Sequence, residues 1–302
     1  MNIFDTEPDK NAAHFVTLSP VSFVQRSAAR CFASQGDPEM NPSSSDPLVL
    51  HTRDARGAIT LTMNRPQAFN ALSEAMIDAL TREFETLQSD ETVRVVVLAG
   101  AGKAFCAGHD LKEMRADPSL DYYQTLFDRC AHMMLAVQRL PVPVIARVHG
   151  IATAAGCQLV AMCDLAVAAR GARFAVSGVN LGLFCSTPSV ALSRNLGRKA
   201  AFEMLVTGEF IDADQALAKG LVNRVVEADR LDAEVESLVA SIVAKPRVAI
   251  ALGKQLFYRQ LEGGIEAAYE DAGRTMACNM MDESALEGVQ AFIEKRRPGW
   301  SQ

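Results

Sequence analysis

The chain has 302 residues, of which 49% are hydrophobic and 22% charged, and its 30 basic and 36 acidic residues give a net charge of −6. No stretch approaches the roughly 18 apolar residues that a membrane-spanning helix needs, and no lysine/arginine block offers charge for nucleic-acid phosphates. We therefore expect neither a membrane span nor a nucleic-acid partner.

The seven cysteines are odd in number and include no C-x-x-C pair, which indicates a reducing compartment rather than a disulfide framework. The five scattered histidines predict no metal site.

The beginning of the chain differs in composition from the rest. Residues 1–47 end in the loop-forming stretch PEMNPSSSDP and show no hydrophobic period, which predicts a mobile N-terminal arm. Residues 11–35 have no acidic side chain but two arginines, a composition typical of a mitochondrial transit peptide. The first ten residues carry three acidic side chains, which such peptides avoid, and an equally good interpretation takes Met40 as the true start of translation.

Strands are predicted from the end of the arm onward. LVLHT (48–52) and AITLTM (58–63) predict a β-hairpin with a polar turn between them. The β-branched run 93–98 and the segment VPVIARV (142–148) lack alternation, which is typical of strands covered on both faces. DLAVAAR (164–170) has the same character. Together these segments predict a largely parallel, buried sheet.

Amphipathic helices separate and follow these strands. Ser73 precedes a helix whose apolar residues recur every three or four positions, and the same spacing predicts a helix over 120–140. Beyond Arg198 the chain turns almost wholly helical, over 199–206, 212–219, 230–243, 247–260, 264–279 and 282–295. We therefore divide the chain into the arm, an α/β core over 48–200 and a C-terminal helical region over 201–302 that docks on the core.

Two segments rich in glycine and alanine follow buried strands. GAGKAFCAGHDLKEM spans 100–114, and VHGIATAAGCQLVAMCD spans 148–164 and runs into a helix. Small residues let the backbone approach a ligand closely, and the first N–H groups of a helix have no intrahelical acceptor. Two such loops facing each other can form an oxyanion hole. By spacing alone, close packing of the backbone is an equally good interpretation.

Six motifs follow one another along the chain: NRPQAFNAL (64–72), AFCAGHDLKEM (104–114), GIATAAGCQLVAMCDLAVA (150–168), ARFAVSGVNLGL (172–183), TGEFIDADQALAKGLVNRVV (207–226) and FIEKRRPGW (292–300). Together they resemble the enoyl-CoA hydratase/isomerase, or crotonase, superfamily. The resemblance implies an α/β crotonase (ClpP-like) spiral of ββα units with a C-terminal helical trimerisation layer. It also implies trimers or hexamers that bind acyl-CoA thioesters, with coenzyme A entering as part of the substrate and no cofactor bound permanently.

Matched position by position, the resemblance assigns the thioester-oxygen donors to the backbone N–H groups of His109 and Ala155. It brings Lys295 to the CoA from the last helix, and it places near the adenine, ribose and phosphates the residues Ala107, Asp110, Leu111, Lys112, Gln67, Ala68 and Phe69. Cations suit the CoA phosphates, and N–H donors suit the charge that develops on a thioester enolate. A solvated surface is the alternative interpretation of Lys112 and Lys295.

The two glutamates that a hydratase of this superfamily uses are absent at the matching positions. Gln158 stands at the first position and Gly178 at the second. A glutamine amide holds a water but cannot take its proton, and glycine has no side chain. Because a positioned acid–base group contributes roughly 10²–10⁴ in rate, we expect the usual hydration route to be lost.

Three functions are compatible with these residues. We favour an enoyl-CoA hydratase/isomerase-like lyase of acyl-CoA metabolism that polarises the thioester. The His109 imidazole could point into the site or toward the CoA, and Cys185 could line the acyl pocket, although a buried small apolar residue is the favoured interpretation of Cys185. The alternatives are a non-catalytic acyl-CoA-binding protein, and a decarboxylase or other lyase on a malonyl-type CoA, whose enolate forms without a base. We expect a soluble protein of the bacterial cytoplasm or the mitochondrial matrix.

Overall fold

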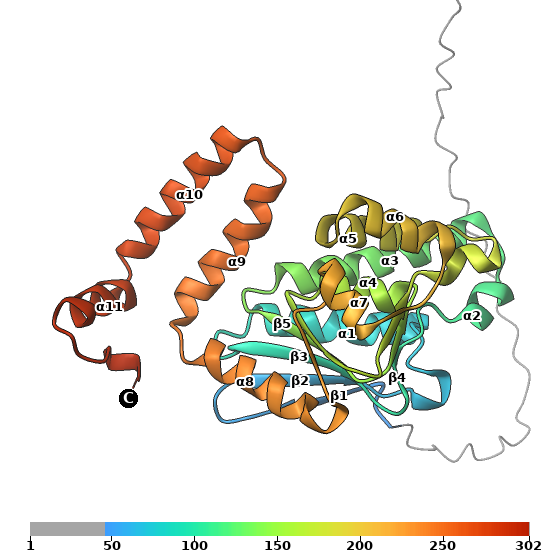
Figure 1. Cartoon of the computed structure of the whole chain (residues 1–302), viewed down its shortest axis with the longest axis horizontal. Helices are drawn as coiled ribbons and strands as arrows, with labels where there is room; N and C mark the ends of the chain where they lie inside the picture. Colours follow the sequence, from blue (N-terminus) through green and yellow to red (C-terminus); the bar gives the residue numbers. More distant parts are fainter. Residues whose placement is uncertain (1–45, 302) are drawn as a thin grey trace, which may run out of the picture. The chain divides into compact units, whose positions relative to one another are not determined.

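The computed structural model describes residues 46–301, so almost all of the predicted N-terminal arm lies outside the described residues (Figure 1). A six-stranded sheet has the order β1-β2-β3-β5-β7-β10, with β1 (Val49–Arg53), β2 (Ala58–Met63), β3 (Val95–Gly100), β5 (Val144–Val148), β7 (Leu165–Ala169) and β10 (Arg224–Val226). β1 and β2 pair antiparallel, and the remaining neighbours pair parallel. The predicted hairpin and the largely parallel sheet are both present.

Helices cover both faces of this sheet. On one face, Val96 and Leu98 of β3 share a core with α1 (Glu74–Gln88) and α3 (Leu120–Arg139). On the other face, Val95 and Val97 pack against α8 (Leu231–Val243). β3 is therefore buried along its whole length, which explains why its sequence is continuously apolar instead of alternating.

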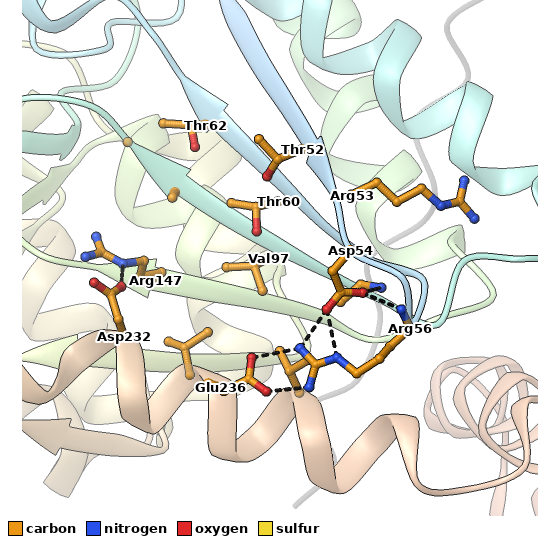
Figure 2. Close-up of a pocket in the computed structure, with 15 residues that line it drawn as sticks. Thr52, Arg53, Asp54, Arg56, Thr60, Thr62, Val97, Arg147, Asp232 and Glu236 are labelled. Carbon is orange, nitrogen blue, oxygen red and sulfur yellow. Dashed lines mark hydrogen bonds and ion pairs between the residues drawn. The ribbon is translucent and has the colours of Figure 1, made fainter.

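The turn between β1 and β2 is tied to α8. The Asp54 carboxylate accepts a hydrogen bond from the backbone N–H of Ala58 at 2.9 Å and closes the turn. Arg56 then bridges Asp54 at 2.6 Å and Glu236 of α8 at 2.5 Å (Figure 2). These ion pairs line one end of a polar pocket between the sheet and α8.

A second sheet has four very short strands in the order β4-β6-β8-β9, namely β4 (Ala104–Cys106), β6 (Ile151–Thr153), β8 (Arg173–Ala175) and β9 (Ile211–Asp212). Strands of two or three residues are too short to show a hydrophobic period, so the sequence pattern did not predict this sheet. The region 201–302, predicted as almost wholly helical, contributes β9 to this sheet and β10 to the first.

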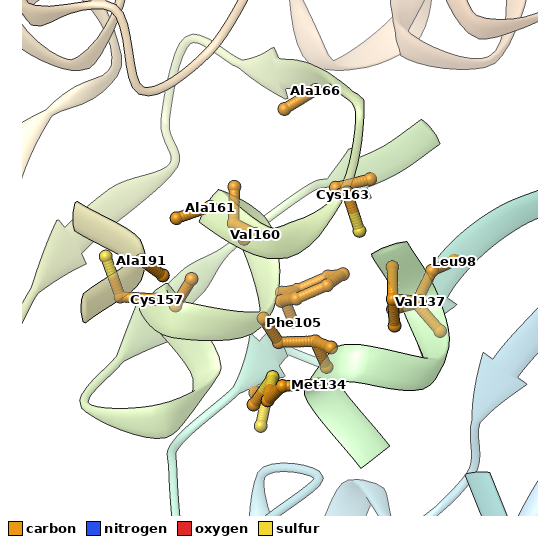
Figure 3. Packing of buried hydrophobic residues seen from close by; sticks show 14 of the residues in the cluster. Leu98, Phe105, Met134, Val137, Cys157, Val160, Ala161, Cys163, Ala166 and Ala191 are labelled. Carbon is orange, nitrogen blue, oxygen red and sulfur yellow. The ribbon is translucent and has the colours of Figure 1, made fainter. Parts of the chain in front are cut away.

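The remaining elements of the core surround the second sheet. They are the 3-10 turns η1 (Pro66–Ala68) and η2 (Ser177–Leu181) and the helices α2 (Leu111–Ala116), α4 (Ala155–Met162), α5 (Ser186–Asn195), α6 (Arg198–Thr207) and α7 (Ala213–Lys219). Phe105 of β4 is fully buried and lies among Met134 and Val137 of α3 and Val160 of α4 (Figure 3). This packing fixes α4 against β4, which matters because the candidate site lies where these two elements meet.

The chain ends in three further helices, α9 (Arg247–Leu261), α10 (Ile265–Met280) and α11 (Glu283–Ile293). Lys254 of α9 is buried, and its Nζ donates to the carbonyl oxygens of Val137 and Val142 at 3.1 and 3.0 Å and to Asp164 Oδ2 at 2.7 Å. The Tyr258 hydroxyl donates to the other carboxylate oxygen of Asp164 at 2.7 Å. A buried ammonium needs such partners to replace its hydration. This cluster, the Lys254 anchor, attaches α9 to the core.

Candidate functional site

A cavity of about 310 Å³ lies where the β4–α2 turn meets the start of α4. It is lined by Ala107, His109, Leu111, Met114, Phe127, Ala154, Ala155, Ser177, Gly178, Leu181, Leu183, Phe184, Cys185, Ser186, Thr187 and Pro188. Most of these side chains are apolar, a few carry hydroxyl, thiol or imidazole groups, and none carries a fixed charge. Such a lining suits an uncharged, largely apolar ligand group with a few polar atoms.

Two backbone N–H groups meet at this cavity. The backbone of Leu72 donates to the Gly108 carbonyl at 2.8 Å and accepts from the Asp110 N–H at 3.2 Å, so the intervening N–H of His109 points away from Leu72. It has no acceptor among residues 46–301. Ala155 is the first residue of α4, and N–H groups in the first turn of a helix have no intrahelical acceptor. A Cβ added to Gly108 would lie 3.2 Å from the Ala155 nitrogen, so the backbone that leads into His109 lies against the start of α4.

The close approach of the two donors depends on unusual backbone at both loops. Gly108 has a φ of +88°, a left-handed conformation that favours glycine. Gly156 has no room for a side chain, because its Cβ would lie 2.1 Å from the Cys106 carbonyl oxygen. Ala154 has φ 51° and ψ −121°, a conformation that costs a non-glycine residue on the order of 1–3 kcal/mol. Its N–H donates to the Ala175 carbonyl at 3.0 Å, and the bend directs the start of α4 at the cavity.

The imidazole of His109 forms part of the cavity wall. Its ring contacts the Phe127 ring edge to face, with 5.4 Å between centroids. Its Nε2 is buried without a hydrogen-bond partner among the described residues. Burial lowers the pKa of His109 to about 4, because removing the imidazolium from water disfavours the charged form. The ring is therefore neutral at physiological pH.

Gln158 and Gly178 stand at the two positions where glutamates are expected, and only one of them lines the cavity. Gln158 is only 4% exposed and does not line the cavity, and its Oε1 has no partner within residues 46–301. Gly178 does line the cavity. A Cβ on Gly178 would lie 2.5 Å from the Leu183 carbonyl oxygen and 2.7 Å from Cys185 Sγ. The chain thus fills the space that a side chain at residue 178 would need.

The residues of 67–69 and 107–112 that are predicted to contact CoA form a rim beside the cavity. Ala107 and Leu111 line it directly, and the N–H of Ala107 donates to the Phe69 carbonyl at 3.0 Å, which brings η1 against the end of β4. Phe69 is 53% exposed. Gln67 and Lys112 are exposed, and Ala68 is half-buried. The side chains of this rim are therefore accessible to a ligand that extends out of the cavity.

Asp110 has a structural role that the motif did not reveal. Its carboxylate caps α2 by accepting from the Lys112 N–H at 3.0 Å and pairs with Arg65 at 2.7 Å. Although burial acts in the opposite direction, these hydrogen bonds hold the pKa of Asp110 below its ordinary value. The Asp110 carboxylate therefore already has hydrogen-bond and ion-pair partners within the protein.

Lys295 is not brought to the cavity. It is exposed, follows α11 and has a φ of +57°, and it is absent from the cavity lining. That Lys295 contacts CoA therefore stays a prediction.

Several lining residues escaped the sequence analysis. Phe127 lies on α3 beside the apolar stripe, and Leu181, Leu183 and Phe184 lie in a segment without periodicity. The sequence offered one signal, which is that these three large apolar residues lie close together without a helix or strand period. In the structure all three are more than 40% exposed. Large exposed apolar residues gathered at one place mark a binding surface.

A second cavity, of about 540 Å³, lies on the opposite side of the main sheet, toward α8 (Figure 2). Its three guanidinium groups are already paired with carboxylates: Arg53 with Asp90, Arg56 with Asp54 and Glu236, and Arg147 with Asp232. Charges satisfied within the protein have little left to offer a ligand. We therefore assign the functional site to the smaller cavity, where two donors and an imidazole have no partner among the described residues.

Neither a metal centre nor a membrane-spanning helix is found in the part of the chain that the structure describes. Residues 46–301 contain no group of three or more metal-binding side chains. None of the helices within that range is long and apolar enough to cross a membrane.

Residues 53–302 match the family model described as Enoyl-CoA hydratase/isomerase. Together with the two sheets, the C-terminal helices and the paired backbone donors, this match shows that the chain belongs to the enoyl-CoA hydratase/isomerase family. The predicted α/β crotonase fold and the predicted family are confirmed.

Particular relatives agree with this assignment. The chain is similar to enoyl-CoA hydratase domain-containing protein 3, mitochondrial, of Rattus norvegicus, with 42% identity over 270 residues that cover 89% of this chain and 90% of the relative. A solved enoyl-CoA hydratase of Mycobacterium smegmatis has a TM-score of 0.84 and 73% identity, covering 85% of this chain and 100% of that one. Human enoyl Coenzyme A hydratase domain-containing protein 3 has a TM-score of 0.81 and 40% identity, covering 84% of this chain and 100% of that one.

Proposed function

We propose that the chain binds an acyl-CoA thioester with its carbonyl oxygen between the backbone N–H groups of His109 and Ala155. The observation that carries this proposal is the pair of neighbouring N–H donors at one cavity, neither of which has an acceptor among the described residues. Donors fixed by the backbone stabilise the negative charge that develops on a thioester oxygen, and loss of one such donor typically costs about 3–4 kcal/mol of barrier. The acyl group then occupies the 310 Å³ cavity.

The CoA portion extends over the rim formed by 67–69 and 107–112. Ala107 and Leu111 support the nucleotide with apolar contact, and Lys112 supplies a cation for phosphate. Gln67, Ala68 and Phe69 lie next to the same rim because Phe69 pairs with Ala107. Lys295 contributes from the last helix of another copy of the chain, since its own helix does not meet this cavity.

The reaction we favour is that of an enoyl-CoA hydratase/isomerase-like lyase whose proton transfers do not use the two usual glutamates. Gln158 and Gly178 offer no carboxylate, so hydration of a simple enoyl-CoA is expected to be slow or absent. A non-catalytic acyl-CoA-binding protein is the second candidate, and the closed space at Gly178 favours it. A malonyl-type decarboxylase is the third, because a lining without fixed charge disfavours a carboxylate in the ground state.

A chromophoric thioester tests the donor pair without requiring turnover. A dienoyl-CoA such as 2,4-hexadienoyl-CoA absorbs at longer wavelength when its carbonyl is polarised. Ala155→Pro removes one of the two N–H groups, while Ala155→Ser keeps the N–H and serves as the matched control. We expect a red shift on binding to the unaltered chain and to Ala155→Ser, and its loss in Ala155→Pro. Binding to the unaltered chain without a shift would contradict the proposal.

Turnover separates the three candidates once binding is established. Crotonyl-CoA hydration and malonyl-CoA decarboxylation are followed by mass, with Gln158→Glu as the variant that restores one carboxylate. Gly178→Glu is a poor choice, because its Cβ has no room beside Leu183. Tight binding with no product from either thioester supports the binding protein, and loss of carbon dioxide from malonyl-CoA supports the decarboxylase.

The C-terminal helices support assembly into trimers or hexamers. On α10, Ile265, Tyr269 and Met276 are each more than 70% exposed, and their spacings of four and seven residues place them on one helix face. An exposed apolar stripe of this kind is typical of an interface with another copy. Light scattering after size exclusion is expected to give three or six copies, and a monomeric mass would contradict the assembly.

The names of the relatives suggest a cellular compartment for this chain. Their printed names describe a mitochondrial protein in Rattus norvegicus and a probable enoyl-CoA hydratase in Mycobacterium leprae. We place this chain accordingly in the mitochondrial matrix or the bacterial cytoplasm.

A further inference from the structure

The side chain of His109 is a hydrogen-bonding group that the proposed thioester contact leaves unused. Only the backbone N–H of this residue takes part in that contact. The ring lies in the cavity wall, and its Nε2 is buried without a hydrogen-bond partner among the described residues. Buried polar side-chain atoms nearly always have a partner in folded proteins. An unpaired imidazole in a ligand cavity therefore points to a partner on the ligand.

The other polar groups of the cavity are already used or less buried. The Ser177 hydroxyl is 3.0 Å from the Thr153 hydroxyl, and the Ser186 hydroxyl turns to the Phe184 carbonyl. Thr187 is only half-buried. Among the side-chain nitrogen and oxygen atoms of the residues that line the cavity, His109 Nε2 is the one that is buried without a hydrogen-bond partner in the described part of the chain.

The position and charge of the ring restrict what it can recognise. The ring branches from the same residue whose N–H faces the thioester oxygen, so it reaches acyl-chain atoms only a few bonds from the thioester carbonyl. Burial keeps the ring neutral, with its pKa lowered to about 4. A neutral imidazole has one donor and one acceptor, which suits a hydroxyl or keto oxygen. It brings no positive charge to pair with a carboxylate.

We propose that the His109 side chain selects acyl-CoA thioesters that carry an uncharged oxygen near the thioester, such as 3-hydroxyacyl and 3-oxoacyl groups, over unsubstituted and malonyl-type acyl groups. This specificity rests on the proposed binding of the thioester between His109 and Ala155. A site built to hydrogen-bond a substrate oxygen discriminates strongly against the analogue that lacks it, because the buried polar group of the site is then left unpaired.

Calorimetric binding of four ligands tests the specificity. Butyryl-CoA, 3-hydroxybutyryl-CoA, acetoacetyl-CoA and malonyl-CoA are compared in the unaltered chain, in His109→Phe, which keeps a flat ring without nitrogen, and in His109→Gln, which keeps a donor and an acceptor. His132→Phe is the matched control, because His132 is exposed on α3 and pairs with Glu85 outside the cavity. We expect 3-oxygenated ligands to bind at least about tenfold tighter than butyryl-CoA, with the preference lost in His109→Phe and partly kept in His109→Gln.

A direct signal from the ring covers the case in which His109→Phe does not fold. The ¹⁵N chemical shifts of the His109 imidazole in the unaltered protein are expected to move on addition of acetoacetyl-CoA and to stay unchanged with butyryl-CoA. Equal affinity for butyryl-CoA and the 3-oxygenated ligands would overturn the specificity while leaving the thioester site intact. Failure of all four ligands to bind would instead overturn the proposed function.

Discussion

Acidification from pH 7.5 to pH 5 is expected to destabilise the fold through His109. The pKa of this imidazole is about 4 in the folded chain because of burial, and about 6.5 when unfolded. As the pH falls below 6.5, the unfolded chain binds a proton that the folded chain resists. Stability is therefore lost on acidification, by about 2 kcal/mol between pH 7.5 and pH 5 from this residue alone.

Urea denaturation at both pH values and at fixed protein concentration measures the effect. The unaltered chain is compared with His109→Gln, which carries no ionisable group at this position. Burial also lowers the pKa of His149, but this residue is present in both proteins and its contribution cancels in the difference. We expect the loss of unfolding free energy on acidification to be about 2 kcal/mol smaller in His109→Gln. The same loss in both proteins would refute a neutral, buried His109.

Three further substitutions test the backbone and the anchor. Lys254→Met leaves the Asp164 carboxylate without its cation and should lower the unfolding free energy by about 3–5 kcal/mol; chemical denaturation showing a change below about 1 kcal/mol would contradict the anchor. Gly178→Ala forces a Cβ against the Leu183 carbonyl and should lower stability by about 1–3 kcal/mol, seen as a lower Tm. Ala154→Gly relieves the positive φ and should raise stability by about 1 kcal/mol in the same melting experiment, whereas a loss would argue against strain there.

The part of the fold that sequence patterns predicted is the part with long periodic elements. The hairpin, the buried strands at 95–100 and 144–148 and the helix at 120–139 all agree with their predicted positions within two or three residues. The second sheet was not predicted, because its strands have two or three residues and obtain their order from neighbours distant in the sequence.

The candidate site likewise has a part that local sequence predicted and a part that depends on contacts between distant residues. The two glycine-rich loops could be recognised from local composition, and the structure brings His109 and Ala155 to one cavity. The closed space at Gly178 could not be foreseen, since it depends on where the Leu183 carbonyl lies. The partnership of Asp164 with Lys254 joins residues 90 positions apart, and no local pattern reports a contact across that distance.

The Lys254 anchor also connects α9 to the helix α4 that begins at the candidate site. Asp164 stands two residues after the end of α4, and Ala155 is the first residue of the same helix. Moving α9 away from Asp164 would separate the Lys254 ammonium from the Asp164 carboxylate. Because both side chains are largely buried, this separation is costly in free energy. A helix of eight residues is about 12 Å long, so Asp164 and the N–H of Ala155 lie near the two ends of one short helix. Helix α9 is therefore connected through Asp164 and α4 to the backbone at one edge of the candidate site.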